Sequence, residues 1–139
     1  MGSVLIDNTS TTKTKKVQTM EQLIFFNSRD NLLRLVVKHI VYFEADGNYT
    51  IIMTKNKLKV QVGISLARME VSLSEQLQEQ ASIFMRIGKR YIINREYVFN
   101  INCAHQRLVL SDMQTFAFAL PVSKEALKKM KDLFILTHI

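Results

Sequence analysis

The sequence is poor in the residues that build disulfide frameworks and membrane spans. Its 139 residues include one cysteine, one proline, four glycines and no tryptophan. The single Cys103 excludes an internal disulfide and is typical of a reducing compartment, so we expect a cytoplasmic protein. No apolar run approaches the roughly 20 residues that cross a bilayer, and no secretory signal opens the chain, which argues against a membrane protein.

Catalytic and metal-binding patterns are also missing. The histidines lack metal-ligand spacing, and Cys103 with His105 falls short of a closed zinc site. Glu44 and Asp46 lie two residues apart at the end of an expected strand, where a turn motif is a better interpretation than a general acid and base. The sequence has no glycine-rich phosphate loop and no nucleophile elbow. We therefore expect neither an enzyme nor a protein with a metal, a cofactor or a small-molecule substrate.

Positive charge is in excess. Nineteen lysines and arginines against twelve acidic residues give a formal net charge of +7 and a pI near 9.7. This balance favours anionic partners, with nucleic acid the first candidate and a membrane surface the second. Because 47% of the residues are hydrophobic, the chain can bury the core of one globular domain.

The beginning of the chain differs in composition from the rest. It is rich in Ser, Thr and Lys with little periodicity, which predicts a flexible basic tail over residues 1–22 and a folded domain over residues 23–139. Lys13, Lys15 and Lys16 suit a basic arm on nucleic acid, although an inert leader is the commoner role of such a segment.

Strand signals dominate the folded part. Short β-branched and aromatic runs are separated by turn residues, and the Asp-Gly-Asn cluster at 46–48 is the strongest turn signal. Residues 58–62 alternate as a half-buried strand does. Helical spacing follows Ser65, and a second capping pattern at Ser72 indicates that this helix breaks and restarts there. We expect a mostly β domain, with a minor α+β character, eight or so short strands and two helices.

One segment gathers cations beside a strand. In residues 84–94 an apolar run is interrupted by Arg86, Gly88 lets the backbone turn, and Lys89 and Arg90 follow before the chain re-enters the core. Cations anchored in this way suit a phosphate-rich partner. A hairpin with solvated charges explains the segment about as well.

The last helix carries a row of lysines. Pro121 ends a strand, and Ser123 is a good N-cap. Lys124, Lys128 and Lys131 then share one face of the helix. This row fits a phosphate backbone, and it also fits a solvated helix face, which is the commoner outcome.

Three motifs, in order, resemble the LytTR family, the DNA-binding output domain of bacterial LytR/AlgR/AgrA-type response regulators. They are IVYFEADGNY at 40–49, FMRIGKRYIIN at 84–94 and PVSK at 121–124. The resemblance covers residues 32–136. Each motif alone is a weak signal, whereas the three in family order are fairly specific.

The resemblance implies an elongated sandwich of short, mainly antiparallel β-strands with two short helices. Such domains present loops, rather than a recognition helix, to successive major grooves. The implied function is sequence-specific binding of double-stranded DNA at promoter repeats by a bacterial transcriptional regulator, as a homodimer or as paired monomers.

The resemblance also indicates which residues contact DNA. Polar or basic side chains stand at or beside the family's motif positions: Asn48, Tyr49, Arg86, Lys89, Arg90, Ser123 and Lys124. Lys89 and Lys124 suit guanine edges or phosphate, and Asn48 suits adenine. The N-terminus of the last helix offers its free N–H groups to a phosphate.

The second motif departs from the family pattern. Gly88 stands where the family often has His, and Arg90 where it has Ser, so the family's base preference does not transfer. The residues before Leu23 are too few for the receiver domain that many family members carry, so we do not expect control by phosphorylation within this chain.

Two other functions compete with DNA binding. A non-catalytic β module could dock an acidic protein partner, with Phe25, Phe26 or Phe134 forming an exposed patch. Single-stranded RNA could stack on tyrosines such as Tyr42, Tyr49 and Tyr91 if their rings share an exposed sheet face beside cations, but we expect Tyr91 to be buried.

Overall fold

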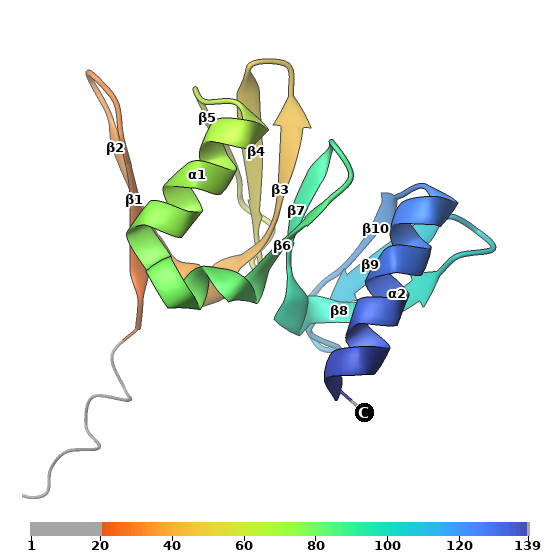
Figure 1. Ribbon diagram of the computed structural model, residues 1–139. Coiled ribbons are helices and arrows are strands. Elements are labelled where there is room, and N and C mark those ends of the chain that lie inside the picture. Colours follow the sequence, from red (N-terminus) through yellow and green to blue (C-terminus); the bar gives the residue numbers. More distant parts are fainter. Residues whose placement is uncertain (1–20, 139) are drawn as a thin grey trace, which may run out of the picture.

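The computed structural model describes residues 21–138, and strands dominate that part of the chain (Figure 1). The predicted tail therefore lies outside the described residues, apart from its last two. The strands of the described part are β1 (Leu23–Asn27), β2 (Leu32–Val36), β3 (Ile40–Asp46), β4 (Tyr49–Thr54), β5 (Lys59–Val62), β6 (Phe84–Ile87), β7 (Tyr91–Asn94), β8 (Val98–Asn102), β9 (Arg107–Ser111) and β10 (Ala117–Pro121). The helices are α1 (Leu66–Leu77) and α2 (Lys124–His138), with 3-10 turns at Val37–His39, Gln78–Ile83 and Arg95–Tyr97.

The strands form three antiparallel sheets. The central sheet has the order β5-β4-β3-β7-β6, a second sheet has the order β10-β9-β8, and β1 pairs only with β2. In Figure 1 the β1–β2 hairpin and α1 lie on one side of the central sheet, and the second sheet with α2 lies on the other. This arrangement confirms the prediction of a mostly β domain built from short antiparallel strands and two helices, with ten strands in the described part.

The central sheet is buried on both faces because side chains alternate along its strands. Phe43 and its cross-strand neighbour Ile52 pack into the core beneath α1, whereas Tyr42 and Met53 pack into the core beneath the second sheet and α2. A register shift between Ile40 and Tyr42 marks a bulge at the start of β3. One strand thus joins the two cores.

Helix α1 is continuous, so the predicted break at Ser72 is wrong. The helix begins at Ser65, whose Oγ accepts a hydrogen bond from the Arg68 N–H at 3.2 Å. The Ser72 hydroxyl does not cap a new helix but accepts from Nε2 of Gln76 at 3.1 Å. Met69 before Ser72 and Leu73 after it are both buried in the same core, and this continuous packing stripe keeps one helix.

Gln76 ties the β1–β2 hairpin to α1. Its amide accepts from the Phe25 N–H at 2.9 Å and donates to the Phe25 carbonyl at 2.7 Å, so one side chain satisfies both polar groups of a strand residue. The apolar contact comes from Ile24 and Phe26, which are buried in the same core as α1. Phe26 is therefore buried, whereas the protein-docking hypothesis placed it in an exposed patch.

Asn94 joins β7 to the start of β3. Its side chain is 1% exposed, donates to the Ile40 carbonyl at 2.9 Å and accepts from the Glu96 N–H at 2.9 Å. The backbone pairing of β3 with β7 ends at Tyr42 opposite Ile93. Beyond that point the side-chain amide of Asn94 makes the hydrogen bond between the two strands. The same residue caps the 3-10 turn that leads from the central sheet to the second sheet.

Replacing Asn94 by Ala is expected to destabilise the fold by about 1–3 kcal/mol, because a buried carbonyl and a backbone N–H both lose their partner. Urea unfolding with an unchanged m-value measures this loss. Asn100→Ala, on an exposed position of β8, is the matched control and should change stability by less than about 0.5 kcal/mol. Equal effects of the two substitutions would contradict the role of Asn94 in holding β7 to the start of β3.

Candidate nucleic-acid interface

Three turns from distant parts of the sequence lie along one edge of the molecule, the upper edge in Figure 1. They are the β3–β4 turn, the β6–β7 turn and the first turn of α2. The Ala45 N–H donates to the Arg90 carbonyl at 2.8 Å, which joins the end of β3 to the β6–β7 turn. A groove of about 270 Å³, lined by Gly88 and Ser123, lies between that turn and α2.

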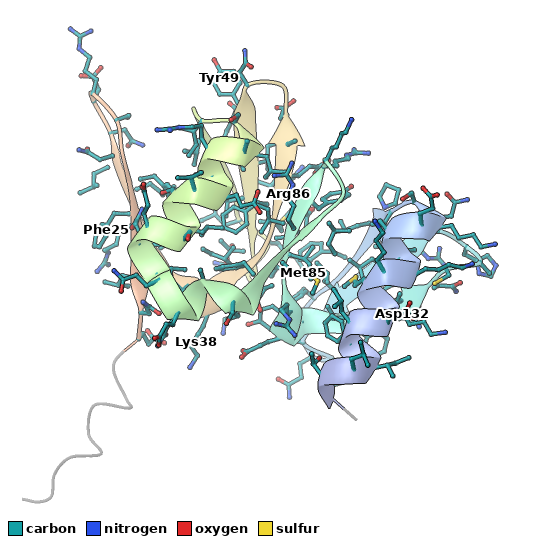
Figure 2. All side chains as sticks on the ribbon, viewed as in Figure 1. Phe25, Lys38, Tyr49, Met85, Arg86 and Asp132 are labelled. Atoms are coloured by element: carbon teal, nitrogen blue, oxygen red, sulfur yellow. The ribbon has the colours of Figure 1, made fainter. Side chains whose placement is uncertain are left out.

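The β3–β4 turn presents Asn48 and Tyr49. Asp46 pairs with Tyr49, so Gly47 and Asn48 form a two-residue turn, and Gly47 has a φ of +61° that a glycine adopts without steric cost. Asn48 is exposed, and Tyr49 is half exposed at the upper edge (Figure 2). The tyrosine ring lies over Gly63, where an added Cβ would be 3.8 Å from Cε1.

The β6–β7 turn presents Lys89. Ile87 pairs with Tyr91, which leaves a three-residue turn over residues 88–90. Gly88 begins this turn with a φ of +60°, and beyond its two chain neighbours no residue has a heavy atom within 4 Å of the place where a Cβ would stand. Lys89 is exposed.

Arg86 lies behind this turn rather than at its tip. Its Nε donates to the Gly88 carbonyl at 3.0 Å and its Nη2 to the Lys89 carbonyl at 3.3 Å. Its Nη1 forms an ion pair with Glu70 of α1 at 2.8 Å. Figure 2 shows the side chain between α1 and the β6–β7 hairpin. A DNA contact by Arg86 stays a prediction, and its nitrogens already have protein acceptors.

Arg90 is held by an acidic residue of β3. Its Nη2 and Nε donate to Oε2 of Glu44 at 2.9 and 3.2 Å, and its guanidinium lies 5.3 Å from the centre of the Tyr91 ring. The hydrogen bond to Glu44 raises the pKa of Arg90, so the charge is permanent. Burial, and then the Glu44 carboxylate, raise the pKa of the nearby Tyr42 to about 12.

The first turn of α2 presents Ser123 and Lys124. The Ser123 Oγ accepts from the Ala126 N–H at 3.2 Å, which confirms the predicted N-cap. Lys124 is exposed, as are Lys128 and Lys131 farther along the helix. The buried stripe of Leu127 and the neighbouring apolar positions fixes the helix on the second sheet, so its N-terminus keeps one place relative to the groove.

The geometry brings together most of the sequence-predicted contact residues and adds two that the sequence did not suggest. Asn48, Tyr49, Lys89, Arg90, Ser123 and Lys124 are all exposed at the three turns, and Arg86 lies behind them. The additional residues are Glu44 and Glu70, which hold the two arginines. They lie 46 and 16 residues away from their partners in the sequence, so no local pattern could have identified them.

The aromatic arrangement speaks against RNA stacking on the sheet. Tyr42 and Tyr91 are 6% and 2% exposed and meet edge-on inside the core, so the predicted burial of Tyr91 is confirmed and Tyr42 has no free face. Phe134 packs against the core beneath the second sheet and lies near Arg95.

None of the helices within residues 21–138 is long and apolar enough to cross a bilayer.

Comparison with known proteins relates the chain to DNA-binding domains. Residues 30–135 match the family model described as the LytTr DNA-binding domain. The heme-containing CO-sensing transcriptional regulator RcoM 1 of Paraburkholderia xenovorans is 27% identical over 107 residues, which are 76% of this chain. The chain spans only 37% of the length of that relative.

A solved structure shares the fold. The LytTr DNA-binding domain of a putative methyl-accepting/DNA response regulator from Bacillus cereus superposes with a TM-score of 0.56. The match covers 83% of this chain and 98% of that chain, at 19% identity. It therefore shows that the two domains share the arrangement of sheets and helices.

Replacing Glu44 by Gln is expected to tighten DNA binding by about 1.5- to 5-fold, because Arg90 no longer gives up a partly exposed ion pair when it turns to a phosphate. Fluorescence anisotropy at fixed salt measures the change. Glu75→Gln, on an exposed position of α1, removes the same charge and is the control. Weaker binding by Glu44→Gln would contradict this expectation. It would show instead that Arg90 contacts DNA only in the orientation that its hydrogen bonds to Glu44 give it.

Proposed function

Because the chain belongs to the LytTr DNA-binding domain family, we propose that it binds specific double-stranded DNA sequences through the three turns, as the DNA-binding part of a bacterial transcriptional regulator. The observation that carries this proposal is the convergence of the three turns on one edge, with exposed basic or amide side chains on each. A docking surface for an acidic protein would need charge but no such set of projecting turns.

The three turns carry side chains of the types that read base edges. Asn48 can pair with adenine, and Lys89 and Lys124 can donate to the acceptors of guanine in the major groove. Each projects from a turn whose ends are fixed by strand pairing or by helix packing, so the backbone of the turn needs little further ordering on binding. Together they supply the sequence selectivity in this proposal.

Phosphate contacts supply the affinity. Arg90 is a permanent cation at the same edge, and Ser123 leaves the first N–H groups of α2 directed at an incoming anion. Tyr49 adds a hydroxyl that can donate to a phosphate oxygen. The net charge of +7 adds long-range attraction to DNA.

The shape of the edge suits binding along one side of the duplex. The β3–β4 and β6–β7 turns belong to neighbouring hairpins, and the first turn of α2 lies across the groove from them. In this proposal the two ends of that row enter successive major grooves, which recur about every 34 Å along B-DNA. Binding to promoter repeats then follows from two copies side by side, as a homodimer or as paired monomers. In this proposal the chain regulates transcription by binding DNA and catalyses no reaction. Its expected location is the cytoplasm.

The name of RcoM 1 describes a heme-containing CO sensor, and this chain matches 37% of its length. We carry over to this chain only a role in transcription regulation. Within residues 21–138 no group of three or more His, Cys, Asp or Glu side chains could hold a metal ion.

The salt dependence of binding tests the proposal. With roughly five phosphate contacts, affinity for the promoter duplex should fall about 10²- to 10³-fold between 50 and 200 mM salt. Lys89→Ala should weaken binding to that duplex about tenfold, since a specific base contact contributes roughly 1–3 kcal/mol. Anisotropy titrations with the gene's own upstream region and with random duplex measure both effects.

Lys38→Ala is the matched control, because this exposed lysine lies at the lower edge in Figure 2. It removes the same charge and should leave selectivity unchanged. Equal, weak binding of the wild-type protein to both duplexes, or a flat salt response, would contradict sequence-specific DNA binding.

A further inference from the structure

Arg86 occupies an unusual position for a residue in a DNA-binding motif. It lies on β6 with its side chain 28% exposed, and each of its three nitrogens has a protein acceptor. Two of these acceptors are consecutive carbonyls of the turn that carries Lys89, and the third is the Glu70 carboxylate. A guanidinium is well suited to this because its donors form a rigid planar fork.

Glu70 connects this fork to the core. It lies on α1 directly after Met69, which is fully buried, so the carboxylate stands on a helix fixed by core packing. The β6–β7 turn has less support of its own. Gly88 has no side chain, its added Cβ would meet nothing within 4 Å, and Lys89 is exposed. The contacts from Arg86 therefore link the tip of the turn to the body of the domain.

The fork also changes the electrostatics of the turn. Carbonyl oxygens carry partial negative charge and would repel a nearby phosphate. Here the Gly88 and Lys89 carbonyls are hydrogen-bonded to a cation, so their negative ends are compensated. The exposed Lys89 ammonium therefore approaches an anionic partner without repulsion from these two carbonyls, and Arg90 on the same turn adds a second exposed cation.

We propose that Arg86 and Glu70 form a clamp that positions the β6–β7 turn for base reading, and that Glu70, an acidic residue, is thereby required for sequence-specific DNA binding. This inference rests on the proposed function. Arg86 is a positioning residue in it, and Glu70 acts through Arg86. The clamp differs from the Glu44–Arg90 pair, in which the arginine itself faces the partner.

The sign of the Glu70→Ala effect separates the clamp from simple electrostatics. Loss of an acidic side chain from a DNA-binding domain should tighten binding to any duplex. The clamp predicts the opposite for the specific duplex: affinity falls about 2- to 5-fold, the loss expected when a partly exposed ion pair that positions the turn is removed. Binding to random duplex stays equal or tightens, so the selectivity ratio falls by more than the affinity.

Glu75→Ala is the matched control, since it makes the same substitution at an exposed position of the same helix. Arg86→Lys keeps the charge but loses the fork, and the clamp predicts that it loses selectivity as Glu70→Ala does. The double variant should be no weaker than either single variant, because both remove one unit. The slope of log affinity against log salt should stay at the wild-type value in all of them.

Anisotropy titrations of these variants against specific and random duplex decide the matter, with thermal unfolding checked for each protein. A wild-type protein without selectivity would overturn the proposed function itself. A selective wild type with Glu70→Ala binding the specific duplex as tightly as Glu75→Ala would overturn the clamp alone. Near wild-type selectivity of Arg86→Lys would also overturn it, since a lysine can replace a phosphate contact but not a fork.

Discussion

Burial of β3 on both faces is the constraint on which the rest of the structure depends. Its alternating side chains join the core beneath α1 to the core beneath the second sheet. Because β3 is central, the β3–β4 turn, the β6–β7 turn and α2 are all positioned from it, through β4, β7 and the second core. A DNA-binding edge made of three separate turns needs such a common reference, since turns have little internal rigidity.

Ion pairs fix the arginines at the edge formed by the three turns. The excess of positive charge favours DNA in general, but the two arginines nearest the turns are each paired with a glutamate. Pairing gives up some non-specific attraction and fixes where the cations lie. A protein that must choose among many sites on DNA gains more from fixed geometry than from additional unrestrained charge.

Local sequence signals predicted the fold well where the physical cause was local. The Asp-Gly-Asn turn and the caps at Ser65 and Ser123 each depend on a few neighbouring residues, and all three are present. The predicted break at Ser72 was wrong because buried Leu73 and Leu77 continue the core stripe, a tertiary effect. The roles of Glu44 and Glu70 were invisible for the same reason, since strand pairing and helix packing bring them to their arginines.

Amide chemical-shift changes on titration with the promoter duplex test the central claim most directly, that the three turns form one DNA-binding surface. The account predicts that the largest changes fall together on residues 46–49, 87–91 and 122–126, and that they saturate at the same duplex concentration. Changes centred on the β1–β2 hairpin, or confined to one of the three turns, would contradict it.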